Sequence, residues 1–474
     1  MQNSRIAQLN KHEFNGSSVV YVMSRDQRVQ DNHALIAAQL QAIEHKVPLY
    51  VFFNLRAVSG RSREHYQFML DGLKEVASDL EKLAIPFVMR SGDATKNILE
   101  FAKEVGAGAL FFDFSPLTGS RAIAKAVAAS FSGTVNVVDT HNVIPVWVAS
   151  DKQEFAAHTM RRKVHKYLEN YLKEPLAVAS HKTPPSHSPT SMSFSEAHQF
   201  IQDIPAAGVT IEAKPGEKAA HSHLKKFLTH HLTNYAIGRN DIAHDQQSAL
   251  SPYLHYGQLS SLRVALETIK TTDRRPLLFE EVKLASPGEE PSAYDGMNAL
   301  LEEMVVRKEL ADNFCFYADD YRSLSSGPKW AQQSLAEHAA DQREFIYSRE
   351  QWENAKTHDA SWNAAQNQLR QTGKIHGYMR MYWAKKMLEW SVSPEQALKD
   401  CIYLNDKYSV DGGDPNGYVG ILWSIVGLHD RPWFERPVFG KIRYMNEGGL
   451  MRKYDVKSYT NRWLSPMPLK SSQT

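Results

Sequence analysis

The sequence predicts an α/β fold: a Rossmann-like, doubly wound parallel sheet at the amino terminus, followed by an all-helical domain at the carboxy terminus. Three observations predict this arrangement. Short, wholly apolar runs alternate with amphipathic helical stretches over residues 1–150, a segment rich in Pro, Ser and His follows, and helical periodicity dominates from residue 219 onward. Because strands that are apolar throughout are buried on both faces, their alternation with helices predicts a parallel sheet covered by helices.

Five apolar runs, rich in β-branched and aromatic residues, are the predicted strands: residues 19–23, 47–53, 85–89, 109–114 and 135–139. Between the second and third, residues 65–83 place apolar side chains at helical intervals and predict an amphipathic helix. The turn after the first strand, SRDQRVQDN, lacks the glycines of the dinucleotide fingerprint, and no P-loop motif occurs either. This domain therefore has the shape of a nucleotide binder without the phosphate-binding glycines.

Composition divides the chain into three parts. Residues 1–150 form the predicted α/β domain, residues 151–218 an interdomain linker, and residues 219–474 the helical domain. The linker contains HKTPPSHSPTSMS and KPGEK, whose turn-forming residues have little to bury.

Length and composition also exclude several classes of protein. Of the 474 residues, 42% are hydrophobic and 23% are charged, which is typical of a globular chain rather than a disordered one. No apolar run reaches membrane length, and the first residues lack the apolar stretch of a secretory signal. Two cysteines, Cys315 and Cys401, are too few for a disulfide framework or a four-sulfur metal site. We therefore expect a cytoplasmic protein that does not associate with membranes.

The net charge carries little information, because 55 Lys and Arg against 53 Asp and Glu leave only +2. The distribution is less even, since residues 431–462 contain eight basic and three acidic residues with aromatic residues between them. Taken alone, such a stretch is more typical of a solvated face than of a binding surface.

Residues 377–390 form a predicted helix that brings candidate redox residues together. Trp383 and Trp390 are seven residues apart, so they lie on one face, about 10 Å apart along the axis. Trp362 lies in a separate segment. Tryptophans are usually core residues, and this is the simpler interpretation here. Arg380 and Met381, which place a cation and a soft apolar side chain beside Trp383, are the observation that points toward an electron relay.

Two further segments carry candidate binding groups. In SALSPYLHYGQLSS, Ser248 and Ser251 precede helical sequence, where hydroxyls and free amides suit a phosphate, although an ordinary helix cap is the simpler interpretation. In LEEMVVRKELADNF, Glu303 and Arg307 are four residues apart and can pair on the surface. Alternatively, a carboxyl at the edge of such a partly buried helix has a raised pKa and donates a hydrogen bond. The spacing leaves both interpretations open.

The segment YLNDKYSVDGGDPNGYVGILW predicts a polar loop ahead of an apolar helix. Its carboxylates and amides suit either Ca²⁺ or a polar ring system, and their spacing does not match the EF-hand loop. No zinc site and no Ser-His-Asp triad is indicated, so no metal is expected.

Read together, these segments resemble a known family. RDQRVQDNHAL, LSPYLHYGQLS, ELADNFC and the long run from MRMYWAKKMLEW to GKIRYM are similar to class II cyclobutane pyrimidine dimer photolyases, of the photolyase/cryptochrome superfamily. The resemblance extends over residues 19–456. Its carboxy-terminal strings are particular to class II, whereas the amino-terminal motif is shared across the superfamily.

The resemblance implies a carbon–carbon lyase that uses light to repair DNA. In this family the helical domain holds FAD folded back on itself, and the excited, fully reduced flavin donates an electron to a thymine dimer. The cyclobutane ring then splits and the electron returns. The dimer is flipped out of the duplex into the pocket, as in other base-flipping enzymes. The implied partner is double-stranded DNA that contains such dimers, bound by a monomeric enzyme.

The resemblance also implies roles for individual residues. The residues that match FAD contacts are Tyr235, Ser248, Ser251, Arg380, Asn405, Asp411 and Asp414. Glu303 matches the acid that hydrogen-bonds the dimer's carbonyl groups, and Asn405 matches the asparagine that faces the flavin's central ring. The indoles that match the photoreduction relay are Trp383, Trp362 and Trp390.

Lesion and DNA contacts follow from the same comparison. The matching residues are Arg239, Asn240, Arg307, Met381, Trp423, Arg431 and Arg443. Some members carry tryptophan where this chain has Arg307, so the apolar wall against the dimer differs on that side. A second, antenna chromophore of deazaflavin or folate type occurs in some relatives, and no residue here indicates which. The basic stretch then becomes one cationic face for DNA phosphates.

Three alternatives remain open at this point. A cryptochrome-like blue-light sensor shares FAD and the tryptophans, but is expected to carry a divergent carboxy-terminal extension, whereas this chain ends shortly after Trp463. Repair of the other dipyrimidine photoproduct requires a histidine pair that the sequence does not place. A flavin oxidoreductase with a diffusible substrate predicts nicotinamide turnover in the dark and no affinity for DNA.

Overall fold

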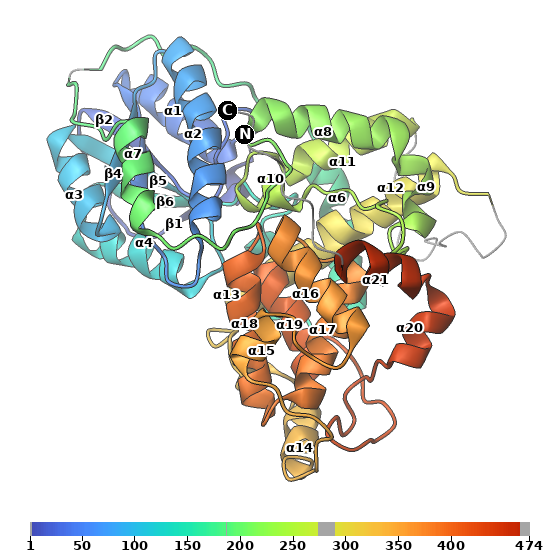
Figure 1. The fold of residues 1–474 in the computed structure, drawn as a ribbon. Helices are drawn as coiled ribbons and strands as arrows, with labels where there is room; N and C mark the ends of the chain where they lie inside the picture. Colours follow the sequence, from blue (N-terminus) through green and yellow to red (C-terminus); the bar gives the residue numbers. More distant parts are fainter. Residues whose placement is uncertain (1, 186, 274–289, 465–474) are drawn as a thin grey trace, which may run out of the picture. The chain divides into compact units, whose positions relative to one another are not determined.

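The computed structural model describes residues 2–185, 187–273 and 290–464, and this part of the chain forms two compact units (Figure 1). Unit 1 comprises Met1–Pro205, Ala213–Ala236 and Ser248–Asp319, and unit 2 comprises Ala206–Glu212, Ile237–Gln247 and Asp320–Thr474. The chain passes from one unit to the other more than once. The predicted boundaries at residues 150 and 218 rest on composition. Composition does not indicate that the chain returns to a unit that it has left.

Unit 1 contains a six-stranded sheet with the order β1-β6-β5-β2-β3-β4. The strands are β1 (Ile6–Gln8), β2 (Ser18–Met23), β3 (Leu49–Leu55), β4 (Phe87–Ser91), β5 (Ala107–Asp113) and β6 (Thr134–Val138). Strands β2 to β6 are parallel, which confirms the predicted sheet and its five strands. The sequence analysis missed β1, an antiparallel edge strand of three partly exposed residues, because so short a segment shows no pattern.

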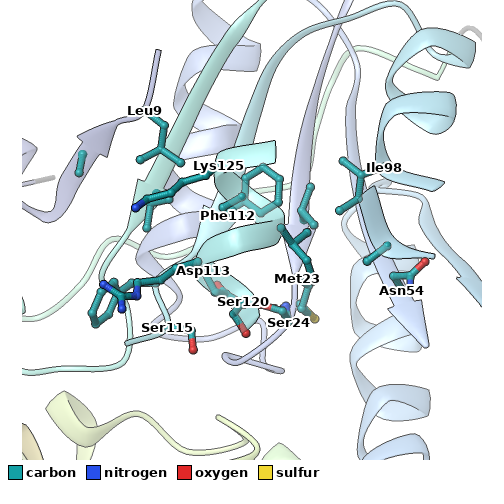
Figure 2. Close-up of a pocket in the computed structure, with 18 of the residues that line it drawn as sticks. Leu9, Met23, Ser24, Asn54, Ile98, Phe112, Asp113, Ser115, Ser120 and Lys125 are labelled. Atoms are coloured by element: carbon teal, nitrogen blue, oxygen red, sulfur yellow. Dashed lines mark hydrogen bonds between the residues drawn. The ribbon is translucent and has the colours of Figure 1, made fainter. Parts of the chain in front are cut away.

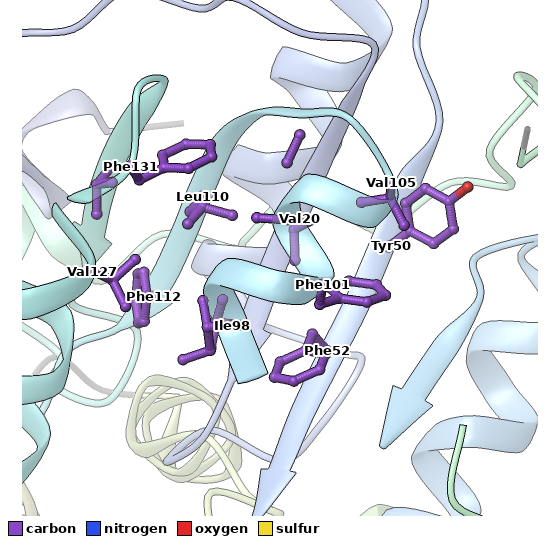
Figure 3. Packing of buried hydrophobic residues seen from close by; sticks show 14 of the residues in the cluster. Val20, Tyr50, Phe52, Ile98, Phe101, Val105, Leu110, Phe112, Val127 and Phe131 are labelled. Carbon is purple, nitrogen blue, oxygen red and sulfur yellow. The ribbon is translucent and has the colours of Figure 1, made fainter. Parts of the chain in front are cut away.

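Four helices flank this sheet, namely α1 (His33–His45), α2 (Arg63–Lys82), α3 (Ala94–Glu104) and α4 (Thr118–Ser130). Helices α3 and α4 pack together on one face, where Phe101 and Val127 meet Phe52 and Leu110 from the strands (Figure 3). Helices α1 and α3 begin at asparagine or aspartate caps: Asn32 accepts from the Leu35 N–H and Asp93 from the Lys96 N–H. The buried apolar strands and helix α2 confirm the local pattern that the sequence predicts, whereas the caps of α1 and α3 were not predicted.

The rest of unit 1 is helical. Its elements are η1 (Asn3–Arg5), α5 (Val146–Ala149), α6 (Ala157–Tyr171), α7 (Phe194–Phe200), η2 (Ile201–Asp203), α8 (Glu217–His230), most of α9 (Leu232–Gly238), α10 (Ser251–His255), α11 (Ser261–Thr272), α12 (Ala293–Leu301), the π-helical turn η4 (Glu302–Arg307) and α13 (Lys308–Tyr317). The segment 151–218 therefore contains α6 and α7 as well as extended chain, and α6 buries Met160 and Val164.

Unit 2 is helical over its described residues, apart from a single bridge between Arg436 and Gly440. Its elements are η5 (Leu324–Ser326), α14 (Lys329–Glu337), α15 (Arg349–Glu353), α16 (Ala360–Thr372), α17 (Gly377–Trp390), α18 (Pro394–Tyr408), α19 (Pro415–Val426), α20 (Glu447–Lys453) and α21 (Val456–Leu464). Helix α17 packs against α16, α18 and α19. It is apolar or aromatic on most sides, as a helix with neighbours all round must be.

Across the described ranges, we find no helix that combines the length and the apolar character needed to span a membrane.

Candidate functional site

Helix α17 carries four predicted site residues, Arg380, Met381, Trp383 and Trp390, and its bounds are those that the sequence predicts. The helix begins after His376, whose Nδ1 accepts a hydrogen bond from the Tyr378 backbone N–H at 3.2 Å. The Arg380 guanidinium lies 3.9 Å from the Asp411 carboxylate, and its side chain is 26% exposed. Helix α17 thus presents a cation to the loop ahead of α19, and that cation remains accessible to a ligand.

The loop between α18 and α19 is organised by Asp406, which the sequence analysis did not single out as a site residue. Its carboxylate accepts hydrogen bonds from Asn405 Nδ2 at 3.1 Å, from the Gly413 backbone N–H at 2.9 Å and from the Tyr418 hydroxyl at 3.2 Å. Gly413 has a φ of +77°, which favours glycine at this position. The sequence alone does not show that the Asp406 carboxylate accepts hydrogen bonds from Asn405, Gly413 and Tyr418.

Asp411 and Asp414 have different roles in this loop. Asp411 Oδ1 accepts a hydrogen bond from the Ser409 hydroxyl and faces Arg380. Asp414 is the amino-terminal cap of α19, because its carboxylate accepts from the Asn416 backbone N–H at 2.9 Å. The loop therefore holds one carboxylate toward the cation and uses the other to begin a helix.

These residues fit the polar edge of a flavin. A flavin ring presents carbonyl and N–H groups side by side, and the Asn405 amide offers both a donor and an acceptor. Arg380 adds a cation beside the same loop. Gly417 has no side chain that would crowd the Asn405 amide, since a Cβ at position 417 would lie 3.0 Å from Asn405 Nδ2. The donor set thus has the chemistry that the resemblance predicts for FAD.

Two of the three predicted relay indoles are in direct contact. The rings of Trp362 and Trp383 stack with centroids 6.2 Å apart and planes 8° apart. The Nε1–H of Trp362 donates to the Trp383 carbonyl at 3.0 Å, and that of Trp383 donates to Gln366 Oε1 at 2.9 Å. The third indole, Trp390, stacks on Trp352, a residue that the sequence analysis did not single out.

Trp423 lies between two cations. Lys385 Nζ is 4.9 Å from the centre of its ring, and the Arg443 guanidinium is 5.5 Å from it. Lys385 is fully buried and donates to the Ser424 carbonyl at 2.6 Å. Burial lowers the pKa of Lys385 to about 7, against the opposing charge of Asp430. The half-buried Trp423 ring is thereby packed against two basic side chains.

The basic stretch begins with a closed loop. Arg443 is anchored by Asp430, to which it donates two hydrogen bonds of 2.7 and 2.8 Å, and it lies 4.2 Å from the centre of the Trp433 ring. The backbone N–H of Trp433 donates to the Lys441 carbonyl at 2.9 Å, which closes the loop. Arg431 is exposed on it. Arginines that are held in place on an exposed loop suit contacts to phosphates.

The other DNA-matching residues of unit 2 lie at the end of α9 and on α17. Asn240 is exposed and Arg239 half-buried just beyond α9, and Met381 is half-buried on α17.

In unit 1, the π-helical turn η4 decides the partners of the predicted acid. A π-turn brings residues five apart onto one side, so Arg307 Nε donates to Glu302 Oε1 at 3.0 Å. Glu302 also accepts two hydrogen bonds from Arg161, at 2.7 and 2.6 Å. The spacing left a pair between Glu303 and Arg307 open as one interpretation; in the structure Glu302 is the ion-pair partner of Arg307, and Glu303 is half-buried beside it.

Of the three residues that match nucleotide contacts in unit 1, Tyr235 and Ser248 contact helix α8. Tyr235 packs edge-on against Phe227, with centroids 5.3 Å apart. The Ser248 carbonyl faces His223 Nε2 at 2.9 Å, and His223 and Phe227 are one helical turn apart. Ser251 is the first residue of α10 rather than its cap, a position that Leu250 occupies. The expected serine cap is thus wrong, although the hydroxyl does lie at a helix start.

One group of buried charges has no role in the predictions made from the sequence. Its members come from the RDQRVQDN turn, from the segment after β6 and from α13. Arg25 donates to both oxygens of Asp312, at 2.7 and 2.9 Å, and Asn142 Nδ2 donates to the same carboxylate at 3.0 Å. Arg28 is 1% exposed and bonds Asp26 at 2.7 Å. The turn that lacks phosphate-binding glycines therefore fastens the sheet to α13.

Glu309 in this group makes stability depend on pH. It is fully buried, and its Oε1 accepts from the Val143 N–H at 2.6 Å. Burial raises the pKa of Glu309 to about 8, although the charge of Lys308 opposes the rise. Because this pKa exceeds the value in an unfolded chain, Glu309 binds a proton more tightly in the folded state. Its contribution to stability is therefore full below about pH 4.5 and is lost as the pH rises through about 8.

We expect Glu309→Gln to remove this pH dependence. Glutamine retains an oxygen for the Val143 N–H and has no proton to lose, so the variant gains stability relative to the wild type as the pH rises from about 5 to about 8. Urea unfolding across this range measures the difference. Glu100→Gln, at a side chain that is 56% exposed, is the matched control. Parallel pH profiles for the wild type and Glu309→Gln would contradict the assignment.

A cavity of about 320 Å³ lies at the carboxyl ends of β2 and β5, where the strand order of the sheet reverses (Figure 2). Ile98 and Phe112 line its apolar side, whereas Ser24 and Asp113 lie at the strand ends. Asp113 accepts hydrogen bonds from the Tyr21 hydroxyl at 2.6 Å and from the Ser24 N–H at 2.7 Å, and burial raises its pKa to about 7. Open α/β sheets bind ligands at this position.

Comparison with known proteins gives consistent results. Residues 19–185 match the family model described as DNA photolyase. A protein from Potorous tridactylus named deoxyribodipyrimidine photo-lyase is 44% identical over 94% of this chain and 81% of its own length. Proteins of the same name from rice and from Methanothermobacter thermautotrophicus are 44% and 37% identical, over 94% and 97% of this chain and 87% and 97% of their own lengths.

Solved structures share the fold at lower identity. A bacterial class III photolyase from Agrobacterium tumefaciens superposes with a TM-score of 0.71 at 20% identity, over 96% of this chain and 88% of its own. A Synechocystis cryptochrome superposes with a TM-score of 0.73 at 14% identity, over 94% of this chain and 88% of its own. The Rossmann-like and helical parts are thus those of the photolyase/cryptochrome fold.

Proposed function

This chain belongs to the DNA photolyase family, and we propose that it is a flavoprotein lyase of the class II type that repairs cyclobutane pyrimidine dimers in DNA with light. The observation that carries the proposal is 44% identity to deoxyribodipyrimidine photo-lyases over nearly the whole chain. The flavin-type donor set around Asn405 and the stacked indoles of Trp362 and Trp383, both in unit 2, support it.

The cofactor is FAD, which when bound, fully reduced and excited supplies one electron to the dimer and takes it back after the ring has opened. Arg380, Asn405 and Asp411 hold the polar edge of the ring, and the cation of Arg380 favours the negative charge of its reduced form. Asp406 keeps the Asn405 amide in place. Tyr235, Ser248 and Ser251 are the proposed contacts for the phosphates.

The substrate is double-stranded DNA from which the dimer is flipped out. Glu303 donates a hydrogen bond to a carbonyl oxygen of the dimer, where negative charge develops after the electron arrives. Met381 and Trp423 line the pocket for the lesion. Arg307, which donates a hydrogen bond to Glu302, is a further proposed contact of the lesion.

The DNA backbone is held by cations rather than by contacts that read bases. Arg431 and Arg443 on the closed loop, with Arg239 and Asn240, contact phosphates and the space that the dimer leaves. Such contacts make the affinity depend on salt and leave it independent of base sequence. The lower cost of unstacking a damaged site supplies the selectivity.

The test follows the dimers directly. Purified protein with its flavin chemically reduced under anaerobic conditions is mixed with an oligonucleotide duplex that contains one thymine dimer. Recovery of thymine absorbance in the light and not in the dark is the expected result. No recovery with reduced FAD bound would overturn the proposal in favour of a light sensor, and nicotinamide oxidation in the dark would indicate an oxidoreductase.

The cavity at the end of the sheet favours a second, antenna chromophore. Its size and its apolar and polar sides suit a flat aromatic ring, such as a deazaflavin or a folate. We expect Ala124→Leu, which fills the cavity from α4, to reduce the absorbance of any co-purifying second chromophore, whereas Ala122→Leu on the exposed side of the same helix does not. Repair in saturating light is expected to be equal in both variants. Equal chromophore content in the two variants would contradict the cavity as the binding site of a second chromophore.

The same proposal places the protein in the cytoplasm with access to DNA, as a monomer and without a membrane partner. Cys315 and Cys401 are both buried, as suits cysteines in a reducing compartment. Light scattering on a size-exclusion column measures the mass in solution, and a dimer would contradict the monomer.

A further inference from the structure

Unit 2 contains a longer aromatic array than the three indoles that the sequence predicts. Trp383 stacks on Trp362 at 6.2 Å, and Trp362 lies 4.8 Å from Trp352 between ring centroids. Trp352 stacks in turn on Trp390 at 6.3 Å, with planes 10° apart. The ring contacts therefore run in the order Trp383, Trp362, Trp352, Trp390. Electron exchange between aromatic rings falls off steeply with distance, so rings in contact form the favoured route.

In the described part of the chain, three indoles of this array have no carboxylate or imidazole as hydrogen-bond partner of the ring N–H. Trp362 and Trp383 donate their Nε1–H groups to neutral amide oxygens. Trp352 is 0% exposed, and among the described residues its Nε1 has no hydrogen-bond partner. An indole that loses an electron in such surroundings keeps its proton, and the positive charge is easily lost by return of the electron. A long-lived separated charge therefore needs a proton acceptor at the end of the array.

Tyr347 and His358 lie at the end of the array and include a proton acceptor. The Tyr347 ring lies 5.1 Å from Trp352 and 6.1 Å from Trp390 between centroids. Its phenol oxygen is 2.6 Å from His358 Nδ1, and the same oxygen accepts the His358 backbone N–H at 3.0 Å. Because the backbone N–H already donates to that oxygen, the phenol O–H is directed toward Nδ1. His358 is exposed, so a proton received there can pass to water.

We propose that Trp352 is the fourth indole of the photoreduction relay and that Tyr347 with His358 is its proton-coupled end. The inference rests on the proposed flavin function, because light-excited oxidised flavin is the oxidant. Trp383 gives up one electron and regains one from Trp362, and the electron vacancy then moves by way of Trp352 and Trp390 to Tyr347. Tyr347 loses one electron while its O–H bond breaks and the proton bonds to His358 Nδ1. A thiol reductant then returns an electron and a proton to Tyr347.

The test uses the full chain with oxidised FAD bound, a light pulse, transient absorption and electron paramagnetic resonance of frozen samples. For the wild type we expect a tyrosyl radical whose formation slows in deuterated water. Tyr347→Phe retains the ring and loses the O–H group, so a tryptophan radical replaces the tyrosyl radical and the separated charge decays roughly tenfold faster. His358→Gln is expected to lower the tyrosyl yield, because it removes the base.

Trp352→Phe interrupts the array, so the radical is expected to remain on Trp362 or Trp383 and to recombine before it reaches the tyrosine. Tyr403→Phe and Trp330→Phe, which lie outside the array, are the matched controls and are expected to behave as wild type. A wild type without a tyrosyl radical, or a Tyr347→Phe spectrum and decay equal to those of the wild type, would overturn the inference. Tyr347 and His358 are not core residues, so the result does not depend on how the protein tolerates the change at Trp352.

The failure of this inference is distinguishable from failure of the proposed function. Repair by chemically reduced flavin does not use the relay, so all of these variants are expected to repair dimers at the wild-type rate after reduction. Loss of the tyrosyl radical with normal repair contradicts the relay alone. Absence of repair in the wild type contradicts the photolyase function, whatever the radical measurements show.

Discussion

Replacement of Arg28 by alanine is expected to lower the free energy of unfolding of unit 1 by about 3–5 kcal/mol, the range found when one partner of a buried ion pair is removed. Arg28 is 1% exposed and donates to Asp26 at 2.7 Å, to the Gly257 carbonyl at 2.9 Å and to the Thr140 carbonyl at 3.1 Å. Its loss leaves the fully buried Asp26 without its main counter-charge. Urea unfolding monitored by circular dichroism measures the change.

The pH dependence of the stability of Arg28→Ala tests whether the lost counter-charge of Asp26 is the cause of the destabilisation. Burial by itself raises the pKa of Asp26, but Arg28 and His141 outweigh it and hold that pKa below its usual range. In the wild type, Asp26 therefore contributes stability above the pKa of an unfolded aspartate and loses it as the pH falls. Without Arg28 the pKa of Asp26 rises, so the variant is expected to recover part of the lost stability at acidic pH.

A surface arginine serves as the control. Arg90 pairs with Glu104 at partly exposed side chains, and Arg90→Ala is expected to cost at most about 1 kcal/mol. Equal costs for Arg28→Ala and Arg90→Ala would contradict a stabilising role for the buried ion pair between Arg28 and Asp26.

Removal of the Glu303 carboxyl is expected to have the largest effect on repair. Glu303→Ala loses the proposed hydrogen bond to the dimer, and loss of one such donor slows a reaction on the order of 10²-fold. Glu303→Gln retains an N–H donor and is expected to lose less, roughly tenfold. The measurement is the number of dimers split per absorbed photon at saturating DNA, with FAD content and DNA affinity determined in parallel.

The neighbouring carboxylate provides the matched control. Glu302 faces Arg161 and Arg307, so Glu302→Gln is expected to change DNA affinity and stability and to leave the yield per bound dimer near that of the wild type. If Glu303→Gln loses its flavin, the residue holds the cofactor and the proposed role is wrong. If Glu302→Gln lowers the yield as much as Glu303→Gln does, the distinct role proposed for Glu303 is contradicted.

Several features could be predicted from the sequence because they depend on residues close together along the chain. The five parallel strands follow from short apolar runs, and α17 has the predicted bounds because its aromatic and apolar residues recur at helical spacing. The α/β and helical parts, the family and the flavin chemistry followed from such local strings. The residue types at the site, such as Arg380, Asn405 and Trp383, could be identified from the same strings.

Other features were decided by the tertiary structure alone. The sequence does not show that Asp406 holds Asn405, that Glu302 rather than Glu303 pairs with Arg307, or that Trp352 stands between Trp362 and Trp390. Arg25 and Asp312 are 287 positions apart, yet they form a buried bidentate pair. Local pattern determines which side chains are buried and which backbone they favour. The partner that each buried polar or aromatic group meets depends on how distant segments close on one another, and no local periodicity records that choice.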